Sequence, residues 1–321
     1  MTSPDSDNIS SHEEYSFQFD GSGTTYLLIF LKHIFLTLVT FGVYFAWAKS
    51  ERRAFIWQSL SFHSSPFRYT GTGIELFKGY LLVAFGYFGF VGIPTLVRVW
   101  SVTLGQLLQG ALVIGLFAVM PFVIYRSRAF LYSRTTWRGI RFGLKREYKA
   151  YAREFYVGAL LTILTLGLYA PITQNRLHRI LMNNTRFGSL EFRYDGDDKT
   201  IWWMTIKGVL LSIVTLGVYF SWFRASLERY RAEHTYIGES AALRSTVSGG
   251  QLYVLYMLNT VGLVLTLGLG FPWILMYSLR SLAGRYSVQG FVDFDGVVQR
   301  STEEGAVAEG VADALDLDFG F

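Results

Sequence analysis

The stretch Thr37–Trp47 reads TLVTFGVYFAW, and altered copies of it occur further along the chain. The clearest copies are TILTLGLYAPI at Thr162–Ile172 and SIVTLGVYFSW at Ser212–Trp222, and VLTLGLGFPW at Val264–Trp273 is weaker. Each copy closes a long apolar run with Thr, Gly and an aromatic residue, and Lys or Arg follows within about two turns of helix. This pattern is typical of a membrane helix that leaves the bilayer, with its aromatic side chains at the headgroups and its cations in water.

The composition favours a membrane protein over a soluble one. Hydrophobic residues make up 51% of the chain and charged residues 17%, whereas soluble domains carry roughly 25% charged residues. The net charge is +5, but the cations cluster beside apolar runs, so the positive-inside bias explains them better than nucleic-acid binding does. The absence of cysteine excludes disulfides, thiolate metal sites and a cysteine nucleophile. The first 25 residues hold acids and no Lys or Arg, so we expect insertion to depend on the first apolar run.

Six apolar runs predict about six transmembrane helices. The first has 22 residues, enough to cross a hydrocarbon core of about 30 Å. The second is predicted to begin near Gly73, because Thr72 and Glu75 have the spacing of a capping box. The six predicted crossings are Tyr26–Trp47, Gly73–Val97, Gln106–Tyr125, Phe155–Ile172, Ile201–Phe223 and Leu252–Leu279. The predicted fold class is therefore an all-α polytopic membrane protein built from internal repeats, with amphipathic basic segments where its helices leave the membrane.

Short strands are expected between the helices. Phe17-Gln-Phe19-Asp20-Gly21 alternates aromatic and polar residues and ends in a turn glycine, which predicts a short strand. The pattern returns at Phe67–Gly71, Phe192–Gly196 and, one residue longer, Phe291–Gly296. The predicted organisation is a disordered acidic tail at 1–14, a repeat-built transmembrane domain at 15–299 and an acidic tail at 300–321.

The distribution of Lys and Arg places both termini outside if all six runs cross. That arrangement puts equivalent repeats on opposite sides of the membrane. Two interpretations remain open: the repeats are inverted, as in many transporters, or a short run such as Phe155–Ile172 re-enters without crossing.

Three features together resemble a known family. They are FRYTGTGIELFKGYL at Phe67–Leu81, the TLGVY-type helix ends, and NNTRFGSLEFRYDG at Asn183–Gly196. In this combination the chain resembles, from about Tyr15 to Val298, the YjgN family of bacterial inner-membrane proteins, a domain of unknown function. The chain departs from the family pattern at Lys32-His33, where an Asn is common, and at Val119–Tyr125, which lacks the TLG signature. The resemblance implies a multi-pass inner-membrane location and no established activity.

Four polar residues inside apolar runs are candidates for a polar path: Lys32, His33, Lys207 and Asn259. A charge at such depth is costly unless it faces water, so a proton relay or solute path is one interpretation. In the other, the lysines reach the nearer interface, while His33 and Asn259 bond to neighbouring helices. The basic segment after Tyr125 is a candidate contact for anionic lipid. Its residues are Arg126, Arg128, Arg134, Arg138, Arg141, Lys145 and Arg146.

No catalytic constellation, cofactor motif or metal-ligand spacing stands out in the sequence. Asp20, Asp195 and Asp295 each precede a glycine, which is ordinary turn chemistry. The first functional hypothesis is a transporter or channel-like permeation protein, from the repeats and the interrupted helices. The alternative is a non-transporting scaffold that interacts with anionic membrane lipids. The sequence does not decide whether copies of the chain associate.

Overall fold

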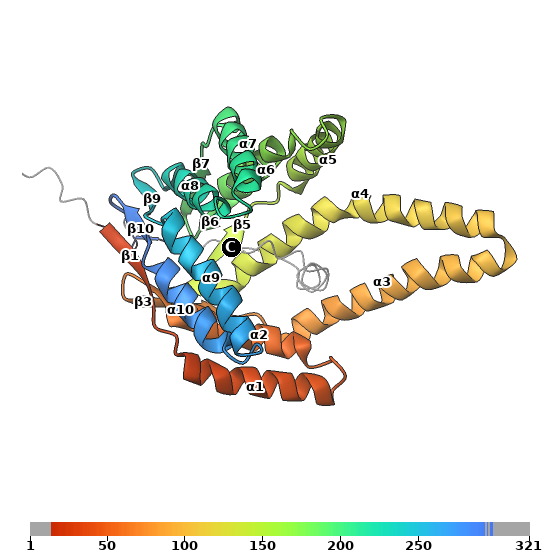
Figure 1. The fold of residues 1–321 in the computed structure, drawn as a ribbon, viewed down its shortest axis with the longest axis horizontal. Helices are drawn as coiled ribbons and strands as arrows, with labels where there is room; N and C mark the ends of the chain where they lie inside the picture. The colour runs from red at the N-terminus through yellow and green to blue at the C-terminus, as the bar shows by residue number, and fades with distance from the viewer. Residues whose placement is uncertain (1–13, 293, 295, 298–321) are drawn as a thin grey trace, which may run out of the picture.

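A computed structural model describes residues 14–292, 294, 296 and 297, and the order strand, helix, helix, strand occurs five times along them. Figure 1 shows the helices extending from the strands, with one pair projecting further than the rest. The strands are β1 (Glu14–Phe19), β2 (Leu60–Phe62), β3 (Ser65–Tyr69), β4 (Thr135–Trp137), β5 (Ile140–Leu144), β6 (Thr185–Phe187), β7 (Leu190–Tyr194), β8 (Thr235–Ile237), β9 (Ala241–Ser245) and β10 (Tyr286–Gln289).

The helices form five pairs, each inserted between two strands. The long pair is α3 (Gly73–Trp100) with α4 (Val102–Arg134). The other four, called the short pairs below, are α1 (Gly23–Val39) with α2 (Phe45–Ser59), α5 (Tyr148–Leu164) with α6 (Ala170–Asn184), α7 (Asp198–Val214) with α8 (Phe220–Glu233), and α9 (Gly249–Leu265) with α10 (Phe271–Ala283).

The ten strands close into a ring in which every neighbour is antiparallel. β1 pairs with β2 on one side and with β10 on the other, so strands from the two ends of the described chain meet. Two-residue turns join several neighbours. His63 and Ser64 turn β2 into β3, and Arg138 and Gly139 turn β4 into β5, all with positive φ. Such turns match the twist of paired strands, so they set the ring's register.

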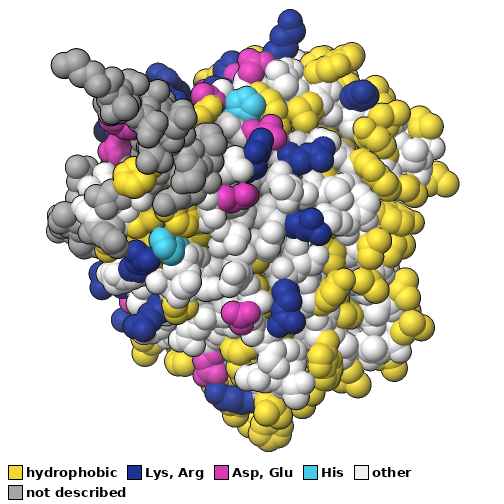
Figure 2. All heavy atoms as spheres, turned by 90° about the vertical axis from the view of Figure 1, so that its left-hand side faces the viewer, with side chains coloured by type: hydrophobic (Ala, Val, Ile, Leu, Met, Phe, Trp, Pro, Cys, Tyr) yellow, Lys and Arg dark blue, Asp and Glu magenta, His cyan; other side chains and the backbone are white. Residues whose placement is uncertain are grey.

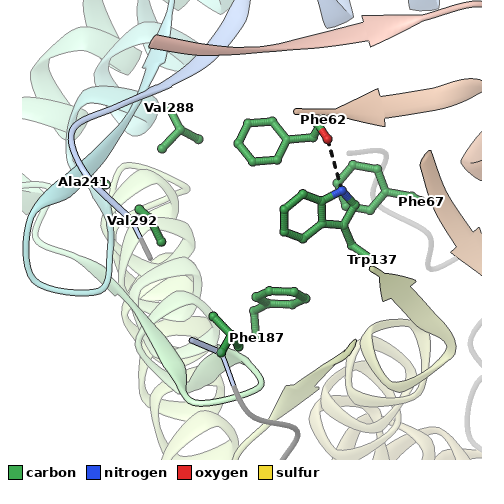
Figure 3. Close-up of a cluster of buried hydrophobic side chains, with 8 residues drawn as sticks. Phe62, Phe67, Trp137, Phe187, Ala241, Val288 and Val292 are labelled. Atoms are coloured by element: carbon green, nitrogen blue, oxygen red, sulfur yellow. Dashed lines mark hydrogen bonds between the residues drawn. The ribbon is translucent and has the colours of Figure 1, made fainter. Parts of the chain in front are cut away.

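The inside of the ring is a packed apolar core rather than an opening. Every strand contributes at least one side chain to a single cluster of buried and half-buried residues. Figure 3 shows Trp137 at its centre, close to Phe62, Phe67 and Phe187. The Trp137 indole N–H donates to the carbonyl oxygens of Phe62 (3.2 Å) and Ser65 (3.0 Å). Because these bonds satisfy the indole, a large aromatic side chain can fill the ring without leaving a polar group unpaired.

The helix pairs form a second closed circuit. The second helix of each pair packs on the first helix of the next pair, and α10 packs on α1. Trp47 of α2 packs against Gly73 of α3, Trp222 of α8 against Gly249 of α9, and Trp273 of α10 against Gly23 of α1. A Cβ on any of these glycines would lie within 2.5 Å of the indole carbons, so only glycine permits the contact.

The predicted all-α fold with about six crossings is wrong. The chain forms a closed ring of ten strands, and among the described residues only α3 and α4 are long and apolar enough to cross a membrane. The four other predicted crossings are each interrupted by a turn at residues 40–44, 165–169, 215–219 or 266–270. Each of these apolar runs therefore holds most of one helix, the turn and the start of the next helix, and hydropathy alone cannot separate that arrangement from one long helix.

Other expectations are met locally. A helix does begin at Gly73 after Thr72, whose backbone N–H donates to the Glu75 carboxylate at 3.1 Å. Three of the aromatic strand patterns fall in β1, β3 and β7. The fourth does not, because β10 ends at Gln289, before Phe291. Residues 1–13, Asp295 and residues 298–321, which include most of the two predicted tails, lie outside the described residues.

Candidate functional site: the exposed ends of the helix pairs

The repeated TLG motif forms the turn at the end of each short pair. Phe41, Leu166, Leu216 and Leu267 occupy equivalent positions and all have left-handed backbone conformations, with φ between 49 and 51°. The glycine after each has φ between 85 and 93°. Two successive positive φ values reverse the chain tightly, and a non-glycine residue in the left-handed region costs about 1 kcal/mol. The motif therefore marks a reversal of the chain, not the exit of a membrane helix.

The threonine of the motif satisfies the polar backbone groups of this turn. Thr40 Oγ1 donates to the carbonyl of Leu36 (2.7 Å) and accepts from the N–H of Tyr44 (2.9 Å). The same pair of bonds is made by Thr165, Thr215 and Thr266 in the other short pairs. A turn closed in this way can leave water without abandoning backbone hydrogen bonds, which is a requirement for any backbone surrounded by lipid.

The end of each short pair exposes a large apolar side chain almost completely. Phe41 is 98% exposed, Leu166 and Leu216 are 94% exposed, and Leu267 is 91% exposed. Figure 2 views the strand end of the molecule, where charged side chains are scattered, and hydrophobic side chains gather along one margin. Clustered exposure of this kind is unusual in a soluble monomer and marks a surface that meets lipid or another protein.

Three of the four polar-path candidates lie at similar distances from the apolar ends of three different short pairs. Lys32 is nine residues before Phe41, Lys207 nine before Leu216, and Asn259 eight before Leu267. At a rise of 1.5 Å per residue, each lies about 12–14 Å from the apolar end of its pair. The structure brings only Lys32 and His33 together. Lys207 is exposed on α7, and Asn259 Oδ1 accepts from the Ser278 hydroxyl of α10 at 3.1 Å.

Glu51 is the partner that sequence reasoning missed at Lys32 and His33. Its Oε2 lies 2.7 Å from Lys32 Nζ and 3.1 Å from His33 Nε2, and its Oε1 accepts from the Tyr44 hydroxyl at 2.9 Å. Lys32 and Glu51 are about half exposed, whereas His33 is buried. Only a turn at residues 40–44 brings α2 back against α1, so the one sequence signal for this contact was the Phe41-Gly42 step.

The basic segment lies around the strand end of α4. Arg126 and Arg128 are on α4, Arg141 is in β5, and Arg146 follows β5. Arg134 pairs with Glu75 at 2.6 Å, Lys145 pairs with Glu191 at 2.7 Å, and the Arg138 guanidinium lies 4.7 Å from the centre of the Trp137 ring system. The segment thus combines contacts that stabilise the ring with cations whose side chains are exposed beside it, such as Arg126 and Arg141.

A charged contact replaces the Trp–Gly packing between α6 and α7. Asp198 accepts from Asn175 (2.8 Å), Arg176 (2.7 Å) and Arg179 (2.9 Å). Burial acts to raise the pKa of Asp198, but hydrogen bonds from Arg176 and Asn175 and the charge of Arg179 outweigh it and hold that pKa below its usual range. Nearby, burial and the charges of Arg231 and Arg128 lower the pKa of His178 to about 3. That imidazole is therefore neutral at physiological pH.

The long pair ends differently. Its helices meet at Ser101 without a Thr–Gly turn, and Trp100 beside it is 92% exposed. Arg98 in the last turn of α3 is also exposed. The most apolar 18-residue windows of α3 and α4 are only 6% and 11% buried, respectively, so these are not core helices of a soluble domain. Trp and Arg beside an apolar helix are typical of a membrane interface.

Together these features define a class of protein in which a closed strand ring carries five helix pairs, the four short ones of which end in an exposed apolar residue. The model of a family of bacterial proteins of unknown function, DUF898, matches residues 14–220 and 209–314, and the chain belongs to this family. Similar curated proteins are each named "Inner membrane protein YjgN", which confirms the resemblance found in the sequence.

The relative from Salmonella typhimurium is 28% identical over 158 residues, which cover 49% of this chain and 38% of that protein. The relative from Escherichia coli K12 is 25% identical over 207 residues, or 64% of this chain and 37% of that protein. The relative from Escherichia coli O157:H7 is 24% identical over 165 residues, 51% of this chain and 39% of that protein. The chain therefore spans about two fifths of the length of these relatives. No solved structure matches it.

Proposed function

We propose that this is an inner-membrane protein whose helix pairs enter the bilayer from the side of the strand ring. The long pair crosses completely, and the short pairs end near the middle of the bilayer. The name of the curated relatives, inner membrane protein, supports the location. The observation that carries the proposal is the end of the short pairs, where a fully exposed apolar residue sits on a turn with internally satisfied backbone.

The closed ring supports entry from one side. Both helices of every pair connect to neighbouring strands of the same ring, so the chain must leave and return on the same side of the bilayer. Crossing once is excluded for such a pair; it must cross twice or re-enter. Of the two interpretations left open by the sequence, re-entry without crossing is the one that this connectivity favours for the short pairs.

The polar girdle, defined as Lys32, Lys207 and Asn259, supports the proposed depth to which the short pairs enter the bilayer. Half of a hydrocarbon core is about 15 Å, and the girdle lies about 12–14 Å from the apolar ends by helix rise. With the ends at the mid-plane, these side chains reach the headgroup level, where Lys is readily accommodated. The strand ring and its cations then lie at or beyond the headgroups.

The function that this arrangement supports best is a non-transporting, lipid-interacting scaffold. The ring interior is filled by Trp137 and its neighbours, which counts against a solute path through the ring. The exposed cations Arg126 and Arg141 lie at the ring end, where anionic headgroups would be within reach. Anionic lipid should therefore bind in a salt-dependent manner, and solute flux in proteoliposomes should not exceed that of empty liposomes.

Depth measurements test the insertion directly, since the chain has no cysteine. A fluorophore on a single cysteine at Leu216 should be quenched most by lipids that carry the quencher near the ends of their acyl chains. The same fluorophore at exposed Asp195, directly after strand β7, should respond to a water-soluble quencher instead. Strong quenching of the Leu216 probe from water would overturn the proposed insertion, and a solute flux abolished by Lys32→Leu would favour permeation over a scaffold.

A further inference from the structure

The two leaflets meet very different amounts of this protein. If the short pairs stop near the mid-plane, all ten helices of residues 14–292 occupy the leaflet on the ring side. Only the two helices of the long pair continue into the far leaflet. This step rests on the proposed insertion; the ten-helix circuit itself is a property of the fold.

The difference in area is large for one molecule. A helix with its side chains is about 10 Å across, or roughly 80 Å² in section. The eight helices of the short pairs therefore add roughly 600 Å² to the near leaflet that the far leaflet does not match. Insertion into one leaflet is the basis on which amphipathic helices respond to curvature. Here the inserted helices are all connected to one strand ring, so they cannot diffuse apart within the leaflet.

The ends of the short pairs have no charged side chain that could bind the headgroups of the far leaflet. They carry Phe41, Leu166, Leu216 and Leu267 with glycines and threonines, and no charge. The long pair has Arg98 and Trp100 at its end. The short pairs are thus suited to remaining in one leaflet, while the long pair fixes the direction in which the ring faces.

We propose that the protein shapes the membrane, expanding the ring-side leaflet and favouring bilayers that are convex toward the ring. Its partner in this activity is the bilayer itself, and no protein ligand is needed. The effect depends on the number of short pairs that stay inserted, so it should fall in steps as pairs are expelled.

The test compares protein density on small and large liposomes that contain the same lipids. The full chain carries a single cysteine in place of Asp195, and an impermeant fluorescent thiol reagent labels and counts only the molecules whose rings face outward. A reagent of a second colour, added after the membrane is permeabilised, labels the molecules whose rings face inward. We expect roughly twofold higher density on the small liposomes, the behaviour of curvature-sensitive inserted helices. Molecules with inward rings should show the opposite preference.

Matched variants separate this activity from folding. Leu216→Asp places a charge at the end of the α7–α8 pair, in a left-handed position that Asp tolerates better than Leu. Leu216→Asn is the uncharged control at the same site. Phe291→Asp adds the same charge at a 70% exposed position beside the ring. Only Leu216→Asp should lower the preference for small liposomes.

Two outcomes would overturn the inference. One is equal density on all liposomes while the Leu216 probe reports a mid-plane position, in which case insertion stands and shaping fails. The other is a curvature preference unchanged by Leu216→Asp and by a second such change at Phe41. A Leu216 probe found in water would instead reject the proposed insertion on which the inference rests.

Discussion

The long pair and the short pairs begin alike and end differently. Both kinds rise from neighbouring strands of one ring, and both pack on their neighbours in the same order. The short pairs turn through a Thr-closed bend with an exposed apolar residue, whereas the long pair continues for several more turns and ends beside Arg98 and Trp100. In the proposed insertion, the length of a pair and the polarity of its end decide whether it crosses the bilayer, and the strand ring sets the side from which it enters.

The largest expected effect is in accessibility. Single cysteines at Thr70 and Asp195 should react with an impermeant thiol reagent from the same side of the membrane, because both lie at the ring. A cysteine at Ser101 should react only from the opposite side, and one at Leu216 from neither. The proposed difference between the long and short pairs is contradicted if Thr70 and Asp195 react from opposite sides of the membrane, or if Ser101 and Leu216 show the same accessibility.

Packing between neighbouring pairs gives the next largest effect. Gly249→Ala places a Cβ about 2.4 Å from the Trp222 ring and 2.6 Å from its Cα, so we expect a loss of roughly 2 kcal/mol in unfolding free energy. Gly250→Ala is the control, because nothing lies within 4 Å of its Cβ. Denaturation in detergent measures both. Equal stabilities for the two variants would show that the contact between Trp222 and Gly249 does not hold the α7–α8 and α9–α10 pairs together.

The charged contact between α6 and α7 should contribute less. Asp198→Asn is expected to cost about 1 kcal/mol, since Arg176 is 38% exposed and water screens the pair. Because the pKa of Asp198 is lowered, its contribution is present above its ordinary value of 3.8 and is lost as the pH falls through the folded-state pKa. The difference between Asp198→Asn and the parent should therefore shrink in acid. A difference that grows on acidification would contradict this account.

The smallest expected effect is at the turn of a short pair. Thr215→Val removes the hydroxyl that bridges Leu211 and Tyr219, and polar contacts within membranes are worth about 0.6 kcal/mol on average. Thr215→Ser keeps the hydroxyl and is the control. Unfolding in detergent and in lipid should be compared, because the loss should be greater where no water replaces the bond. An equal loss in both would place this turn in water.

Much of the local structure was predictable, and the ring was not. The capping box at Thr72 and the strands at Phe67 and Phe192 were visible because short-range patterns determine them. Strands of three residues, such as Thr135–Trp137, are too short for alternation to be detected. The turns could not be predicted because their residues are apolar. Phe41 and Leu216 stand where a turn in water usually has Asn, Asp or Pro. Glu51 was missed for the same reason, since it meets Lys32 only after that bend.

The pairing of β1 with β10 has a consequence for how the chain folds. The residues in this contact, such as Tyr15 and Val288, lie more than 270 positions apart, whereas each helix pair is stabilised by close neighbours in sequence. Contacts so distant form late and slowly. During synthesis the helix pairs are complete before the last strand exists, so the growing sheet has two open edges that can pair with other chains. Chaperones and proteases of the cell should therefore act on the chain before β1 pairs with β10 and the strand ring closes.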